Sequence, residues 1–164
     1  MKIGIVSDSH AKADRLRRAL TALIARGAQA VVHCGDIGST ACLDALAAAG
    51  VPAYAVAGNM DRHLDRLQAA ARKGGVRLSL ETVLLPLGGG SYLAATHGHE
   101  PATVAHLLAE RRFAYVCLGH THQVRDERVG TTRVINPGAL HHAHPPTVAL
   151  LDTDADTVEH IEVP

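Results

Sequence analysis

Residues 1–10, MKIGIVSDSH, begin with a short β-branched run and end in three polar side chains. The run has the composition of a buried strand, and the stretch after it carries leucines at helical spacing before a glycine. This strand and helix pattern then repeats. We predict strands at 2–6, 30–33 and 52–56 and helices at 14–26, 40–48 and 64–72. Such alternation is typical of parallel strands joined by right-handed crossovers.

The second half of the chain keeps one helical pattern, at 102–111, among runs that are typical of strands. Further strands are predicted at 76–87, 91–95, 115–118, 124–128, 132–135, 147–151 and 158–163. No repeat or linker divides the sequence. We therefore expect a single domain over residues 1–164, with an α/β fold of two packed sheets and helices outside them.

The composition narrows the class of protein. Sixteen Lys and Arg residues balance sixteen Asp and Glu residues, and no basic tract suited to nucleic acid is present. Three Tyr and one Phe are too few for a base-stacking platform. No apolar stretch approaches the roughly 20 residues of a membrane helix. An odd count of three cysteines without C-x-x-C spacing favours a reducing compartment. We expect a cytoplasmic chain that binds neither membranes nor nucleic acid.

Polar clusters of one kind follow five of the predicted strands. Because the carboxyl ends of the strands form the binding crevice of an open α/β sheet, these clusters should converge in space. They contain carboxylates, one amide and imidazoles, which are all metal-ligand types. The candidate ligands are Asp8, His10, Asp36, Asn59, His97, His120 and His122.

The spacing of these residues supports a metal centre. Asp8 and His10 are two positions apart, as are His120 and His122, so in an extended segment each pair projects to one side. Glycines at 35, 58, 98 and 119 allow tight backbone beside the ligands and leave room for an ion. The ligands are too many for one tetrahedral ion. They suit two ions, with Asp36 as the natural bridging carboxylate.

The clusters read, in order, D-x-H, G-D, G-N-x-D, H-G-H and G-H-x-H, and an N-P-G loop follows at 136–138. This set resembles the calcineurin-like metallophosphoesterase superfamily, especially its small single-domain bacterial and archaeal phosphodiesterases. The resemblance extends from residue 1 to about residue 151. It implies a two-sheet β-sandwich with helices on both outer faces, in agreement with the pattern above. It also implies two ligand sets, namely Asp8, His10, Asp36 and His122, and Asp36, Asn59, His97 and His120.

The resemblance implies two divalent ions from among Mn²⁺, Fe, Co, Ni and Zn²⁺, with Mn²⁺ as the first choice. The imidazoles independently favour these ions over Mg²⁺. Two such ions supply hydroxide near neutral pH and neutralise phosphoryl oxygens. We therefore expect a phosphodiesterase or phosphatase in which a metal-bound hydroxide attacks a small phosphate ester in line.

Three residues are expected to be catalytic, namely Asp36, Asn59 and His99. The Asn59 amide can donate a hydrogen bond to a phosphate oxygen. Many superfamily members have a histidine directly after this asparagine, where it acts on the leaving group, but this chain has Met60. His99 is therefore our candidate for protonating the leaving alcohol.

Several neighbouring residues keep two interpretations. Asp61 either orients a histidine or caps the next helix. Arg62 and Arg66 either attract phosphate or are solvated helix charges. The histidines at 141, 142 and 144 line the substrate mouth, stack on a substrate or form a polar loop. Cys34 is a small buried hydrophobe or a soft ligand, and His33 is structural or faces the site.

The alternative to an enzyme is a scaffold or protein-binding module that keeps this fold without turnover. The small retromer subunit resembles the superfamily and is such a case, but it departs from the pattern at ligand positions. His10 and Asp36 are both present here, which favours the enzyme. Small members of the superfamily often self-associate, so a homodimer is also considered.

Overall fold

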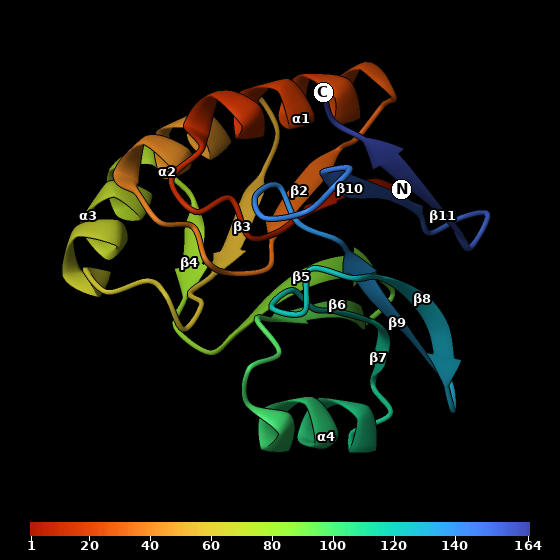
Figure 1. Ribbon diagram of the computed structural model, residues 1–164. Helices are drawn as coiled ribbons and strands as arrows, with labels where there is room; N and C mark the ends of the chain where they lie inside the picture. The colour runs from red at the N-terminus through yellow and green to blue at the C-terminus, as the bar shows by residue number, and fades with distance from the viewer.

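The computed structural model describes residues 1–164 and has four layers, in the order helices, sheet, sheet and helix (Figure 1). The six-stranded sheet contains, in spatial order, β11 (Thr157–Glu162), β10 (Thr147–Asp152), β1 (Lys2–Val6), β2 (Ala30–His33), β3 (Ala53–Val56) and β4 (Arg77–Ser79). The five-stranded sheet contains β5 (Thr82–Gly88), β6 (Ser91–Thr96), β7 (Phe113–Cys117), β9 (Thr132–Pro137) and β8 (Val124–Val129). The expected two-sheet sandwich is confirmed.

Helices lie on the outer face of each sheet. The larger sheet is covered by α1 (Ala13–Ala25), α2 (Thr40–Ala47) and α3 (Leu64–Gly74), and the smaller sheet is covered by α4 (Pro101–Ala109) (Figure 1). None of the four helices has both the length and the apolarity that crossing a membrane requires.

The strands that carry the polar clusters run in matching directions. β1, β2, β3 and β4 pair in parallel, and β6 and β7 form a parallel pair in the smaller sheet. β2 and β3 are buried along their whole length, as is β1 after Lys2, which explains their continuous apolar runs. Within each sheet, the loops that follow these strands therefore leave from the same edge.

Three apolar clusters fill the spaces between the layers. One lies under α1 and α2 and includes Leu16 and Leu43, and another lies under α4 around Phe113. The cluster between the sheets includes Ile5 and Leu93. Full burial of one such side chain stabilises the fold by about 1.5–3 kcal/mol. The inter-sheet cluster fixes the two sheets against each other, so the loops of both sheets keep a defined relation.

The segment 76–87 differs from its prediction as one long strand. It forms two strands in different sheets, because β4 pairs with β3 while β5 pairs with β6. The chain passes from one sheet to the other at Leu80 and Glu81, which are both exposed. No glycine or proline marks this crossing, and both halves have strand-like composition. The sequence pattern therefore cannot locate the break.

Candidate metal centre

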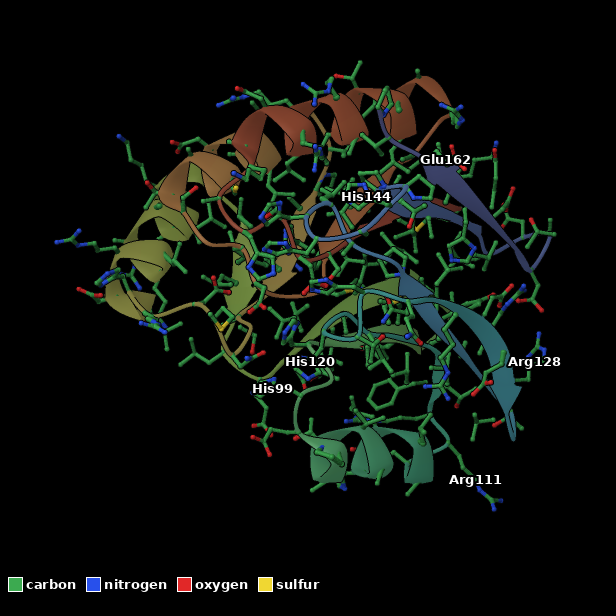
Figure 2. The ribbon with its side chains drawn as sticks, viewed as in Figure 1. His99, Arg111, His120, Arg128, His144 and Glu162 are labelled. Carbon is green, nitrogen blue, oxygen red and sulfur yellow. The ribbon has the colours of Figure 1, made fainter.

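The loops after β1, β2, β3, β6 and β7 meet at one end of the sandwich, beside the carboxyl ends of these strands. The sticks in Figure 2 place His99 and His120 side by side there, and their ring centroids are 6.2 Å apart. A series of short distances connects all seven candidate ligands, although they span residues 8 to 122. The structure thus brings the polar clusters at the ends of these strands together, as we expected.

The first group of side chains surrounds the carboxylate of Asp8. Its Oδ1 lies 3.1 Å from Nε2 of His122 and 3.8 Å from Nε2 of His10. One ligand atom from each of these three residues lies within 4.8 Å of the other two. Asp8 is fully buried, whereas the two histidines are partly exposed, so the group opens toward solvent on the histidine side.

The second group surrounds His97. Its Nε2 lies 3.4 Å from Oδ2 of Asp36 and 3.0 Å from Oδ1 of Asn59, and its ring centroid is 5.2 Å from that of His120. The same Oδ2 of Asp36 lies 3.6 Å from Nε2 of His10, which belongs to the first group. Asp36 therefore lies between the two groups.

Hydrogen bonds set the charge state of the second group. Burial acts to raise the pKa of Asp36, but hydrogen bonds from His97 and from the Met60 N–H outweigh it, so the pKa is lowered. Burial acts to lower the pKa of His97, but its bonds to Asp36 and to the Cys34 carbonyl outweigh that effect, so the pKa is raised. Without another cation, the pair favours a carboxylate beside an imidazolium.

Asp8 shows the opposite balance. Burial raises its pKa, although hydrogen bonds from the Ser7 hydroxyl at 2.5 Å and the His120 N–H at 3.2 Å favour the carboxylate. Asp8 and Asp36 are both buried, and no lysine or arginine forms an ion pair with either. A buried pair of carboxylates is costly unless positive charge is supplied.

The surroundings of His10 show that the site fits divalent metal ions. Nε2 of His10 is buried and has no hydrogen-bond partner, although two carboxylate oxygens lie within 3.8 Å of it. An unpaired buried nitrogen beside buried carboxylates is a costly arrangement that a cation would resolve. The donors are carboxylate and amide oxygens and imidazole nitrogens, which together suit borderline transition-metal ions.

The backbone brings the paired ligands together differently from the expectation. Their two-residue spacing predicts extended segments for Asp8 with His10 and for His120 with His122, and this prediction is wrong. All four residues are in the left-handed region, as is Asp36, with φ values of 54°, 42°, 66°, 58° and 53° for Asp8, His10, His120, His122 and Asp36. Each such residue costs about 1–3 kcal/mol. Sharp turns at the strand ends therefore orient these side chains toward the site. Residue spacing alone does not reveal these turns.

Two glycines allow the loops to approach one another. A Cβ atom at Gly58 would overlap the carboxylate of Asp36, and one at Gly119 would overlap the hydroxyl of Ser7. The glycines were expected to leave room for an ion. The space is instead occupied by side chains from neighbouring loops, so glycine at these two positions permits loop packing.

Asp61 has a role that the sequence analysis missed. Its carboxylate accepts backbone N–H bonds from Ile37 at 3.1 Å, Gly38 at 2.7 Å and Gly58 at 2.9 Å. It does not cap α3, because His63 occupies the N-cap position. Asp61 ties the loop after β2 to the loop after β3, and so fixes the relation between Asp36 and Asn59.

Asn136 plays a similar part for the loop after β7. Its amide donates to the Gly119 carbonyl at 2.8 Å and to the Thr121 hydroxyl at 3.1 Å, which lie on either side of His120. Its Oδ1 accepts from the Gly138 N–H at 3.0 Å. The N-P-G motif is the sequence signal that points to this residue.

Three further histidines lie close to the candidate ligands. His99 lies 5.4 Å from His97 between ring centroids, beside the second group. The ring centroids of His141 and His142 are 3.8 Å apart, with the rings tilted by 44°, and lie 5.8 and 6.0 Å from that of His10. This position favours the first interpretation of these two residues, at the mouth of the site.

His33 and Cys34 are structural. His33 is fully buried, with Nε2 2.9 Å from the Ser9 hydroxyl. The side chain of Cys34 belongs to the apolar cluster between the sheets. Its carbonyl oxygen faces the site instead and accepts a hydrogen bond from Nδ1 of His97 at 2.8 Å.

Residues 1–156 match the family model of the calcineurin-like phosphoesterase superfamily domain, so the chain belongs to that superfamily. This confirms the predicted family and the predicted class of enzyme, a hydrolase of phosphoric esters. The chain is 27% identical to Phosphodiesterase MJ0936 of Methanocaldococcus jannaschii over 156 residues, which cover 94% of each sequence.

Two solved structures show how widely the fold is shared. A novel archaeal phosphodiesterase superposes with a TM-score of 0.90 at 26% identity, over 99% of this chain and 100% of that one. Vps29 from Entamoeba histolytica, a single-site mutant, superposes with a TM-score of 0.65 at 19% identity, over 100% of both chains. The second likeness concerns the fold alone.

Proposed function

We propose that this chain is a phosphodiesterase that holds two divalent metal ions and hydrolyses a small phosphate ester. One observation carries the proposal. Oδ2 of the buried Asp36 lies 3.6 Å from His10 and 3.4 Å from His97, and these histidines belong to two groups of ligand atoms. The relationship to an archaeal phosphodiesterase supports the substrate class.

The proposal assigns both ions to the residues predicted from sequence. One ion is held by Asp8, His10, Asp36 and His122, and the other by Asp36, Asn59, His97 and His120. Mn²⁺ suits this mixture of donors, as do Fe, Co, Ni and Zn²⁺. When bound, such a pair of ions supplies a nucleophile at neutral pH and neutralises charge on the phosphoryl group.

The protein orients its own groups for this task. Nδ1 of His97 donates to the Cys34 carbonyl, which selects the tautomer whose Nε2 lone pair faces the site. Oδ1 of Asp36 accepts the Met60 N–H at 2.8 Å, which leaves Oδ2 facing both groups. Oδ1 of Asn59 faces His97, so its NH₂ group can donate to a phosphate oxygen.

His99 is the proposed proton donor to the leaving alcohol. Its ring lies beside His97 and His120, and Met60 brings no proton to the position after Asn59. A leaving group that departs readily as an anion needs this proton least. His99 therefore matters most for alkyl esters and least for p-nitrophenyl esters.

The test is hydrolysis of bis(p-nitrophenyl) phosphate by the purified protein with Mn²⁺, with and without a chelator. We expect turnover that the chelator removes and added Mn²⁺ restores. Asp36→Ala should abolish turnover, while the matched change Asp44→Ala, on the exposed side of α2, should preserve it. Absence of turnover with any of the five metals, at full occupancy, would favour the scaffold instead.

Three broader predictions belong to this proposal. The catalytic unit is one domain over residues 1–164. A cytoplasmic location is supported by three cysteines that are all buried and free. A homodimer is the proposed oligomeric state, and sedimentation of the purified chain tests it directly.

A further inference from the structure

A pocket of about 380 Å³ lies beside the metal centre, between the start of α2 and the start of α3. Met60, directly after Asn59, forms one part of its lining, and its backbone N–H holds Asp36. Three basic residues, Arg62, His63 and Arg66, also line it. The pocket therefore adjoins the site already described and has a cationic wall.

The two guanidinium groups of this pocket are exposed and have no direct partner in the protein. The side chains of Arg62 and Arg66 form neither a hydrogen bond nor an ion pair, whereas Arg133, for example, binds Asp126 through two nitrogens. Asp61 is the one carboxylate in the lining. Its two oxygens already accept three backbone N–H bonds, so it is not available to pair with an arginine.

These charges also lie where the local structure disfavours them. Arg62 precedes α3 and Arg66 lies in its first turn, where the helix dipole repels cations. Arg72 and Lys73 lie in the last turn, where the dipole favours them. Asp65 is the acidic residue of this turn, but it forms no ion pair with either arginine. An anion in the pocket would therefore meet two free guanidinium groups close to a helix N-terminus, both of which favour negative charge.

We propose that this pocket binds a second phosphate group of the substrate, an inference that rests on the proposed function. The substrate class is then a phosphodiester that carries another phosphate a few bonds from the reacting phosphorus, as in a nucleoside bisphosphate ester. Arg62 and Arg66 grip the second phosphate through their guanidinium groups. Met60, which is 48% exposed, contacts the apolar part between the two phosphates.

The experiment compares two substrates that share the reacting diester and the leaving group. One is the p-nitrophenyl ester of thymidine monophosphate, and the other carries a second phosphate on the remaining sugar hydroxyl. We expect the Mn²⁺-loaded protein to hydrolyse the second with a kcat/KM about tenfold higher, mainly through a lower KM. In Arg62→Gln/Arg66→Gln the ratio of the two kcat/KM values should fall to near one.

The matched control is Arg72→Gln/Lys73→Gln, which removes two charges from the other end of the same helix. This control variant should keep the tenfold ratio. It loses as many positive charges as Arg62→Gln/Arg66→Gln, so the two variants attract anions in general to the same extent. A ratio near one in the unmodified protein, with both esters hydrolysed, would overturn the pocket while leaving the proposed function intact.

Failure to hydrolyse either ester would instead count against the proposed function. The pocket is then tested by calorimetry with the metal-loaded protein, using thymidine monophosphate and thymidine bisphosphate as ligands. About tenfold tighter binding of the bisphosphate, lost in the Arg62→Gln/Arg66→Gln variant, supports the pocket. Equal affinities would overturn it.

Discussion

Two buried histidines near the metal centre have pKa shifts of opposite sign. Burial lowers the pKa of His33 to about 3, and repulsion from His97 adds to this effect, while the hydrogen bond of His33 is to the neutral hydroxyl of Ser9. The pKa of His97 is raised, because Asp36 and the Cys34 carbonyl outweigh the effect of burial. Asp36 acts on both residues, but only His97 forms a hydrogen bond with its carboxylate, and this bond decides which histidine becomes cationic in the metal-free protein.

His33 should make the metal-free protein sensitive to acid. Its folded pKa of about 3 lies below the ordinary value of 6.5, so between these values the unfolded chain binds a proton that the folded chain does not. The contribution of His33 to stability is therefore fully present above pH 6.5 and is lost as the pH decreases toward 3. We expect a loss of about 2–3 kcal/mol in the free energy of unfolding by roughly pH 4.5.

Urea unfolding at a series of pH values, in the presence of a chelator, measures this effect. His33→Gln cannot bind the proton and should show a shallower loss of stability between pH 6.5 and roughly 4.5. Identical pH profiles for the two proteins would show that His33 does not contribute.

At the scale of elements, the metal centre depends on how closely five strand-end loops pack. Gly119→Ala should separate two of them, because the new methyl group would overlap the Ser7 hydroxyl and the Cys34 carbonyl oxygen. We expect a loss of about 1–3 kcal/mol in stability and a weaker affinity for Mn²⁺. Chemical unfolding and calorimetric titration provide the two measurements.

The control for this change is Gly130→Ala, in the turn between β8 and β9. Its backbone is also strained for alanine, with φ at 63°, but no atom lies within 4 Å of the added carbon. It should cost some stability and leave Mn²⁺ affinity unchanged. Equal Mn²⁺ affinities for the two variants would count against close loop packing as the requirement.

The elements of the first half were predictable because each strand is a short apolar run and a glycine closes each of the first two helices. β2 has the expected bounds. The break between β4 and β5 was not predictable, since an exposed leucine and glutamate give no turn signal. The candidate ligands follow from their strand-end positions. The left-handed backbone at Asp8, and the three N–H bonds to Asp61, depend on tertiary contacts that periodicity does not encode.

For the whole molecule, a bound metal pair would link loops from both sheets. Asp8 and Asp36 follow strands of the larger sheet, whereas His97 and His122 follow strands of the smaller one. Ions that bind only the folded chain stabilise it by mass action, by about 2.7 kcal/mol when the free metal is roughly a hundredfold above Kd. We expect Mn²⁺ to raise the Tm by several degrees.

Differential scanning calorimetry with and without Mn²⁺ checks this expectation. Asp36→Ala should respond far less than the unmodified protein, because its carboxylate lies between both groups of ligand atoms. An unchanged Tm at saturating Mn²⁺ would contradict coordination by loops of both sheets.

The pairing of β1 with β10 affects how the chain can fold while it is being synthesised. β1 hydrogen-bonds along one edge to a strand at residues 147–152, and Leu140 donates its N–H to the Ser7 carbonyl directly after β1. While the chain is being translated, that edge of β1 stays open until the strand at residues 147–152 has been made. A nascent or prematurely terminated polypeptide therefore offers an uncovered strand edge beside apolar surface, which is a template for aggregation. Emergence of residues 147–152 from the ribosome is the event that closes it.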